Sequence, residues 1–123
     1  MNEYNKIITK INNEDFFPIY ILVGDENYFA ENIIRLLTSK VVTEDSKDFD
    51  YFKFYGNEVD EDQVIDAAKR FPLVGEYNFI VVKDAKSISK NFDKLSSYIE
   101  VPNTKTILVL SFINQSLDKR KRI

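Results

Sequence analysis

The fold is decided by the stretch Pro18-Ile19-Tyr20-Ile21-Leu22-Val23-Gly24-Asp25-Glu26-Asn27-Tyr28-Phe29-Ala30-Glu31. The run 19–23 is continuously apolar and rich in β-branched and aromatic residues, which is typical of a strand buried on both faces of a parallel sheet. Gly24 suits a tight turn, and Asp25 can cap the helix that follows. We therefore expect a buried strand over 19–23, a glycine turn and a helix over about 26–42.

This strand–helix junction is where a nucleotide-binding α/β protein keeps its phosphate loop. Such a loop needs Gly-x-x-x-x-Gly-Lys-Ser/Thr, because free backbone N–H groups and a lysine hold the phosphate oxygens. Counted from Gly24, the positions of the second Gly, the Lys and the Ser/Thr hold Phe29, Ala30 and Glu31. Two carboxylates in the turn would also repel a triphosphate. We expect a degenerate phosphate loop that binds no cofactor, although backbone amides alone could still hold a phosphate.

Strands and helices alternate along the rest of the chain. Helices are expected over 3–12, 61–70 and 91–101, and strands over 49–55, 79–82 and 106–112. Asp60 is the expected N-cap of the helix over 61–70. The helix over 26–42 has an apolar stripe for the core, which consists of Phe29, Ile33, Leu36, Leu37 and Val41. The alternation predicts a three-layer α/β domain over 1–123, a parallel sheet with helices on both faces.

The composition excludes several classes of protein. With 123 residues, ten Phe, seven Tyr and 44% hydrophobic content, the chain suits one folded domain. It has no Cys and no His, which excludes disulfides, thiolate nucleophiles and nearly all zinc sites, and we expect no metal. The net charge of −3 predicts no strong intrinsic attraction to nucleic acid. No signal peptide or membrane span is evident, so we expect a cytoplasmic protein.

A few polar residues support a rival interpretation. The run 21–27 resembles the acidic start of a two-component receiver domain, in which Asp84 would be the phosphoacceptor and Ser111 would supply a hydroxyl group. Two observations oppose this alternative. A receiver needs a fifth strand that ends in a lysine, and Gly24 replaces the first residue of the usual acidic pair. A solvated strand end is the simpler interpretation of Asp84.

Two further segments could bind a partner. Phe71-Pro72-Leu73-Val74-Gly75 is an apolar connection that either packs under the sheet or protrudes as an anchor. The pattern alone favours packing, and Pro72 would stiffen the local backbone in either case. The tail Lys119-Arg120-Lys121-Arg122 could contact DNA, but a short run of charges at a polar end is more often simply solvated.

Taken together, four segments resemble the N-terminal domain of the bacterial DNA polymerase III delta subunit, a clamp-loader protein. They are the runs 18–28, 52–59, 67–86 and 117–122, and the resemblance extends from about Phe17 to Ile123. No single run is specific, but their order and spacing together fit this family.

The resemblance implies an AAA+-like (P-loop NTPase-like) fold that has lost its phosphate loop and has no catalysis of its own. Members of the family bind the ring-shaped sliding clamp, the beta subunit, and help to open it so that DNA can enter, while neighbouring subunits hydrolyse ATP. The complete holoenzyme is a DNA-directed DNA polymerase. The resemblance also implies that this chain is a fragment whose lid and collar domains, which join the other clamp-loader subunits, are absent. DNA would then be contacted only through the complex, and no membrane would be involved.

The resemblance also assigns a binding site. The clamp contact of the family is made by an apolar pair in the connection before the third strand, which falls here on Leu73 and Val74, flanked by Phe71 and Pro72. The family often has Leu-Phe at the pair, so Val74 would make a smaller contact. AAA+-like sheets have the strand order 5-1-4-3-2, and with only four strands here we expect 19–23 to lie at an exposed edge, available for pairing.

Overall fold

The computed structural model describes residues 3–24, 27–88 and 91–113. The elements follow one another as α1 (Glu3–Asn12), β1 (Ile19–Gly24), α2 (Asn27–Val41), β2 (Tyr51–Tyr55), α3 (Glu61–Lys69), β3 (Asn78–Lys83), the 3₁₀ turn η1 (Ala85–Ser87), α4 (Asp93–Glu100) and β4 (Thr106–Ile113). All the predicted helices and strands are present. None of the helices in the described ranges is long and apolar enough to cross a membrane.

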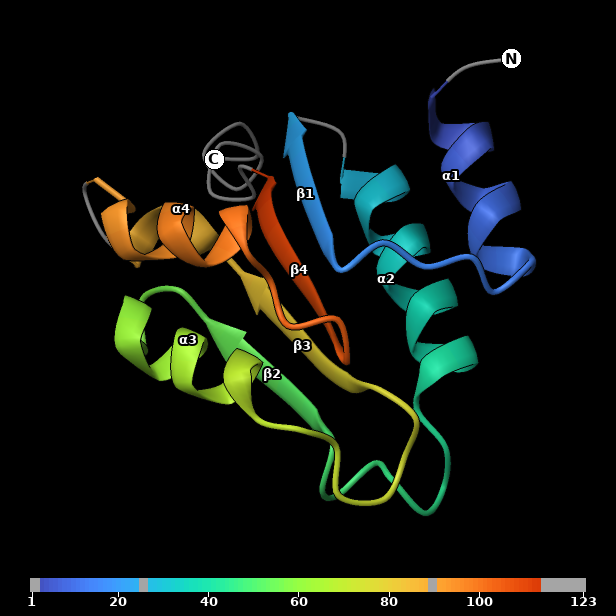
Figure 1. The fold of residues 1–123 in the computed structure, drawn as a ribbon. Coiled ribbons are helices and arrows are strands. Elements are labelled where there is room, and N and C mark those ends of the chain that lie inside the picture. Colours follow the sequence, from blue (N-terminus) through green and yellow to red (C-terminus); the bar gives the residue numbers. More distant parts are fainter. Residues whose placement is uncertain (1–2, 25–26, 89–90, 114–123) are drawn as a thin grey trace.

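The described strands form one parallel sheet in the order β1-β4-β3-β2 (Figure 1). The last strand of the chain therefore lies between β1 and β3, with Ile80 and Ile19 both in register with Leu108. This order agrees with the 1-4-3-2 part of the expected sheet. Within the described residues β1 pairs only with β4, so it lies at the sheet edge as expected.

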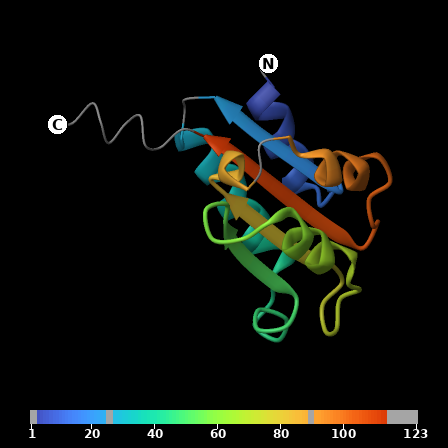
Figure 2. The same cartoon turned by 90° about the vertical axis from the view of Figure 1, so that its left-hand side faces the viewer.

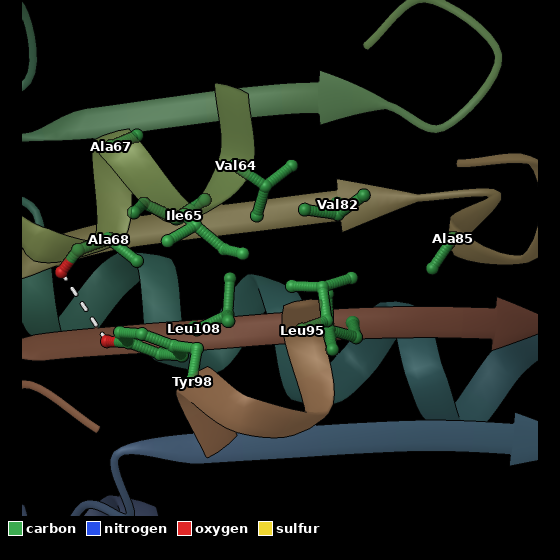
Figure 3. Close-up of a cluster of buried hydrophobic side chains, with 11 residues drawn as sticks. Val64, Ile65, Ala67, Ala68, Val82, Ala85, Leu95, Tyr98 and Leu108 are labelled. Carbon is green, nitrogen blue, oxygen red and sulfur yellow. Dashed lines mark hydrogen bonds between the residues drawn. The ribbon is translucent and has the colours of Figure 1, made fainter. Parts of the chain in front are cut away.

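Helices cover both faces of the sheet, which confirms the three-layer α/β fold (Figures 1 and 2). Alternate residues of β3 and β4 point to opposite sides, as the period of a strand requires. On one side Ile80, Val82, Leu108 and Leu110 pack with α3 and α4, as Figure 3 shows for Val82 and Leu108. On the other side Phe79, Val81, Ile107 and Val109 pack with α1 and α2.

Burial on both faces was predicted for β1, and this is wrong for part of the strand. Tyr20 and Leu22 pack with α1 and α2, but Ile21 is exposed and Val23 is 70% exposed. The cause is the position of β1 at the sheet edge, because the cluster formed by α3 and α4 includes only Ile19 from this strand. An apolar run alone does not distinguish a central strand from an edge strand.

The predicted core stripe of α2 also needs one correction. Ile33, Leu37 and Val41 are buried, but Phe29 is exposed. Its ring lies against that of Tyr4 on α1, with centroids 4.5 Å apart, and Ala30 takes the buried position instead. Leu36 is partly buried against the same core.

Most predicted boundaries agree with the structure to within one residue, but two differ by more. Strand β2 begins at Tyr51 and not at residue 49, because Phe49 and Asp50 end a turn in which their N–H groups donate to the carbonyl of Ser46. Helix α4 begins at Asp93 and not at 91, because Phe92 has a left-handed backbone with φ of 57°. The capping of α3 by Asp60 is confirmed, since its side chain accepts a bond from the N–H of Gln63.

Gly56 generates a prediction about stability. Its N–H donates to the carbonyl of Lys83 at 2.7 Å, and a Cβ here would lie 1.9 Å from the backbone oxygen of Asp84. We expect Gly56→Ala to lower the free energy of unfolding by about 1–3 kcal/mol, because two backbone segments would have to separate. Urea unfolding measures this, with the exposed neighbour Asn57→Ala as the control. An alanine at 56 with wild-type stability would contradict the close packing.

Candidate functional site

The connection between α3 and β3 presents a group of apolar side chains to solvent. Phe71 is 70% exposed, Leu73 is 66% exposed and Val74 is also exposed, whereas Pro72 is partly buried. The pattern alone favoured packing of this loop under the sheet, and the structure shows that its apolar side chains protrude instead. The loop precedes β3, so it lies at the amino end of the parallel sheet, at the bottom of Figure 1.

A buried carboxylate holds the backbone of this loop. The N–H of Leu73 donates to Oδ1 of Asp50 at 2.6 Å, and the N–H groups of Val74 and Gly75 donate to Oδ2 at 2.8 and 2.6 Å. Asp50 itself is only 2% exposed. Three successive backbone donors therefore enclose one carboxylate, an arrangement that favours an anionic group.

The backbone of Asp50 is fixed on both sides. Its N–H donates to the carbonyl of Ser46 at 2.8 Å, and its carbonyl accepts a bond from the N–H of Phe79 at 2.8 Å. Gly75 lies close to the same turn, because a Cβ at this position would be 3.0 Å from Cβ of Ser46. Asp50 thus joins the turn before β2, the loop 71–75 and the start of β3.

The other end of the loop is held where α3 ends. The carbonyl of Ala68 accepts a bond from Oγ1 of Thr106 at 2.7 Å, and that of Arg70 accepts one from Nδ2 of Asn103 at 3.2 Å. Nδ2 of Asn78 donates to the carbonyl of Ala67 at 2.7 Å. Side chains from β3, from β4 and from the connection before β4 therefore satisfy carbonyls at the end of the helix and fix the point from which the loop departs.

The surroundings of Asp50 favour the ionised form of its carboxyl group. Burial raises the pKa of the Asp50 carboxyl, but the hydrogen bonds from the N–H groups of Gly75, Leu73 and Val74, with the nearby charge of Arg70, outweigh burial and leave the pKa below its usual value. Donors that bind the ionised form favour it over the neutral acid. Asp50 is thus ionised at neutral pH, the state in which both oxygens accept these bonds.

At the opposite end of the sheet, the predicted phosphate-loop position is occupied by the protein's own side chains. Gly24 has φ of 122°, a backbone conformation that glycine adopts without strain. Glu31, at the Ser/Thr position of the motif, forms an ion pair with Lys83 at the end of β3. Ala30 is buried and Phe29 lies against Tyr4. A carboxylate and an ammonium group here neutralise each other.

Asp84, the phosphoacceptor of the receiver alternative, follows β3, and Ser111 lies in the neighbouring strand β4. The Asp84 side chain accepts a bond from the hydroxyl of Ser87 at 2.8 Å, and Ser111 is buried in β4 in register with Leu22. Over the described ranges there is no cluster of three or more Asp, Glu, His or Cys residues that could hold a metal ion. The pair Asp25-Glu26 and the basic tail 119–122 lie outside the described residues.

The sequence analysis identified the loop but missed the residue that holds it. Asp50 is 23 residues before Leu73 and was placed inside a predicted strand, so its side chain had no expected partner. Phe49, which is exposed immediately before Asp50, was also taken as a strand residue. The one sequence signal was an Asp at the entry to an aromatic strand, where strand propensity disfavours it.

Comparisons with known proteins agree with this architecture. The sequence profile of the family described as DNA polymerase III, delta subunit, matches residues 20–123. The chain belongs to this family. It is 32% identical over 115 residues to the DNA polymerase III subunit delta of Bacillus subtilis (strain 168), covering 86% of this chain. The solved structure of the Bacillus subtilis DNA clamp loader delta protein (YqeN) superposes with a TM-score of 0.79 at 28% identity over 88% of this chain.

This delta-family chain spans about a third of the length of these relatives, 33% of the first and 34% of the second. Membership places the chain among the delta subunits of DNA polymerase III. It favours that assignment over the receiver alternative.

The lowered pKa of Asp50 predicts how the stability of the domain depends on pH. A carboxyl whose pKa is lower in the folded state stabilises the protein above its unfolded pKa, and this stabilisation is lost as the pH falls through the folded value. We expect the wild type to exceed Asp50→Asn in unfolding free energy at pH 6, and the difference to shrink below the ordinary Asp value of 3.8. Urea unfolding at several pH values measures it.

Asp48→Asn is the control for this comparison, because it removes the same charge from an exposed position in the same turn. A stability difference between wild type and Asp50→Asn that stays constant down to pH 3 would contradict the stabilising role of the ionised carboxyl.

Proposed function

We propose that this chain is the clamp-binding domain of a clamp-loader delta subunit. It binds the DNA polymerase sliding clamp and helps to open the ring for loading onto DNA, through Phe71, Pro72, Leu73 and Val74. The observation that carries this proposal is a firmly held loop with exposed apolar side chains in a chain of this family. The name of the Bacillus subtilis relative, DNA clamp loader delta protein, supports the same role.

The loop has the properties of a binding anchor. A protein surface usually avoids several adjacent exposed apolar side chains unless they bind a partner. Burying Leu73 fully in a pocket of the clamp would contribute roughly 1.5–3 kcal/mol. Val74 offers less area, and Phe71, the most exposed of the group, adds aromatic surface beside the pair. Leu73 is therefore the proposed centre of the contact.

We also propose that the domain descends from an AAA+-like ATPase and has no ATPase activity of its own. The strand order β1-β4-β3-β2 fits such a sheet. The Glu31–Lys83 ion pair supports the loss of nucleotide binding, because it joins the Ser/Thr position of the motif to the end of β3. In P-loop enzymes these two places hold the magnesium ion. ATP would be hydrolysed by neighbouring subunits, and the domain would act in the cytoplasm and meet DNA only within the complex.

Truncating the proposed central residue tests the clamp contact. We expect Leu73→Ala to weaken binding of the chain to its own sliding clamp by about tenfold to a hundredfold, because a largely buried leucine is lost. Titration calorimetry or surface plasmon resonance measures the affinity. Since Leu73 is exposed in the free chain, the substitution should change the free energy of unfolding by less than about 0.5 kcal/mol.

Tyr28→Ala is a matched control, because Tyr28 is 65% exposed, close to the value for Leu73, but lies at the opposite end of the sheet. It should bind the clamp as the wild type does. Equal affinities of Leu73→Ala and the wild type would overturn the site assignment, and failure of the wild type to bind the clamp would overturn the proposed function.

The second part of the proposal predicts no nucleotide binding. Calorimetric titration with Mg-ATP should give no heat of binding at micromolar concentrations, because the lysine of the motif is Ala30 and a carboxylate occupies the next position. A dissociation constant in the micromolar range would show that the loop still functions.

A further inference from the structure

We infer that Asp50 is a positioning residue for the docking loop, holding the backbone of residues 73–75 in the clamp-binding conformation before the partner arrives. This inference rests on the proposed function, since it concerns the same loop. The inference is that the buried Asp50 carboxylate, which lies in a different segment, keeps Leu73 and Val74 in place for binding. The carboxylate covers neither of these two side chains.

The geometry shows how one side chain holds the backbone of two exposed residues. The N–H groups of Leu73, Val74 and Gly75 all point inward to the Asp50 oxygens, at 2.6 to 2.8 Å. These hydrogen bonds engage the backbone of Leu73 and Val74 and leave their side chains uncovered. Leu73 and Val74 accordingly remain exposed although their backbone is bound to a fully buried group.

An apolar contact could not order the loop and also leave the Leu73 side chain exposed. Packing Leu73 against the domain would order the loop, but it would also cover the surface that the clamp must contact. Charge-assisted hydrogen bonds to the backbone order the loop and leave its side chains free. The attachment of Asp50 to Ser46 and Phe79 transmits the rigidity of the turn and of the sheet to the carboxylate.

Isosteric replacement isolates this role. In Asp50→Asn one carboxylate oxygen becomes an NH₂ group, which donates and cannot accept. At least one N–H of the loop then loses its acceptor, and two lose it if the amide nitrogen takes the place of Oδ2. The volume of the side chain is unchanged. The apparent dissociation constant scales inversely with the fraction of chains that have the competent loop, so a fall of this fraction to about a tenth weakens binding about tenfold.

The test combines clamp affinity with residue-specific amide exchange. In the wild-type chain the amides of residues 73–75 should exchange slowly for an exposed loop. In Asp50→Asn they should exchange about tenfold faster or more, while the amides of β3 and β4 remain protected. Affinity for the sliding clamp should fall about tenfold in the same variant. Asp48→Asn, which removes the same charge from an exposed site, should match the wild type in both measurements.

A double-mutant cycle separates positioning from a general structural effect. If Asp50 acts by presenting the anchors, Asp50→Asn should weaken clamp binding much less in a chain that already carries Leu73→Ala and Val74→Ala. Unchanged exchange of residues 73–75, or unchanged affinity despite faster exchange, overturns the inference even when the wild type binds the clamp. If the wild type does not bind the clamp, the proposed function fails and the positioning role fails with it, whatever the exchange shows.

Discussion

Parallel pairing of all the described strands is the constraint on which the rest of this domain depends. Parallel neighbours require a crossover between them, so helices are forced onto the faces of the sheet, and the carboxyl ends of all strands meet at one edge. Strand β4, last in the chain, completes the sheet by lying between β1 and β3. Without it, β1 with its two helices would have no strand partner in the described structure.

The same constraint places the two notable segments of the sequence at opposite ends of the sheet. The Gly24 junction follows β1 and lies at the carboxyl end, whereas the loop 71–75 precedes β3 and lies at the amino end. The junction therefore does not hold the loop directly. Glu31 and Lys83 close the carboxyl end with an ion pair, and Asp50 organises the amino end with three hydrogen bonds.

These two arrangements use charge in opposite ways. The Glu31 carboxylate forms an ion pair with the Lys83 ammonium group, and these two charges neutralise each other. The Asp50 carboxylate accepts hydrogen bonds from three backbone N–H groups, so it holds a segment of backbone whose apolar side chains stay exposed. In the proposed function the first arrangement replaces a nucleotide site and the second supports a protein-binding site.

The sequence by itself determined the helices and strands, the α/β class, the family and the loop that contains Leu73 and Val74. These follow from local properties, namely apolar periodicity, capping residues such as Asp60, and the order of short motifs. It did not determine which apolar residues are exposed. Val23 and Phe29 have the pattern of core residues and are exposed, because the sheet edge and the packing of α1 decide their surroundings.

Only the tertiary structure decided that the loop 71–75 protrudes and that Asp50 holds it. Hydrogen bonds between segments 23 to 25 residues apart leave no periodic signal in a sequence. A single Asp before a strand has many possible roles until folding brings specific backbone donors to its oxygens. The physical reason is that residues distant along the chain decide both the hydrogen-bond partners of the loop backbone and the exposure of its side chains.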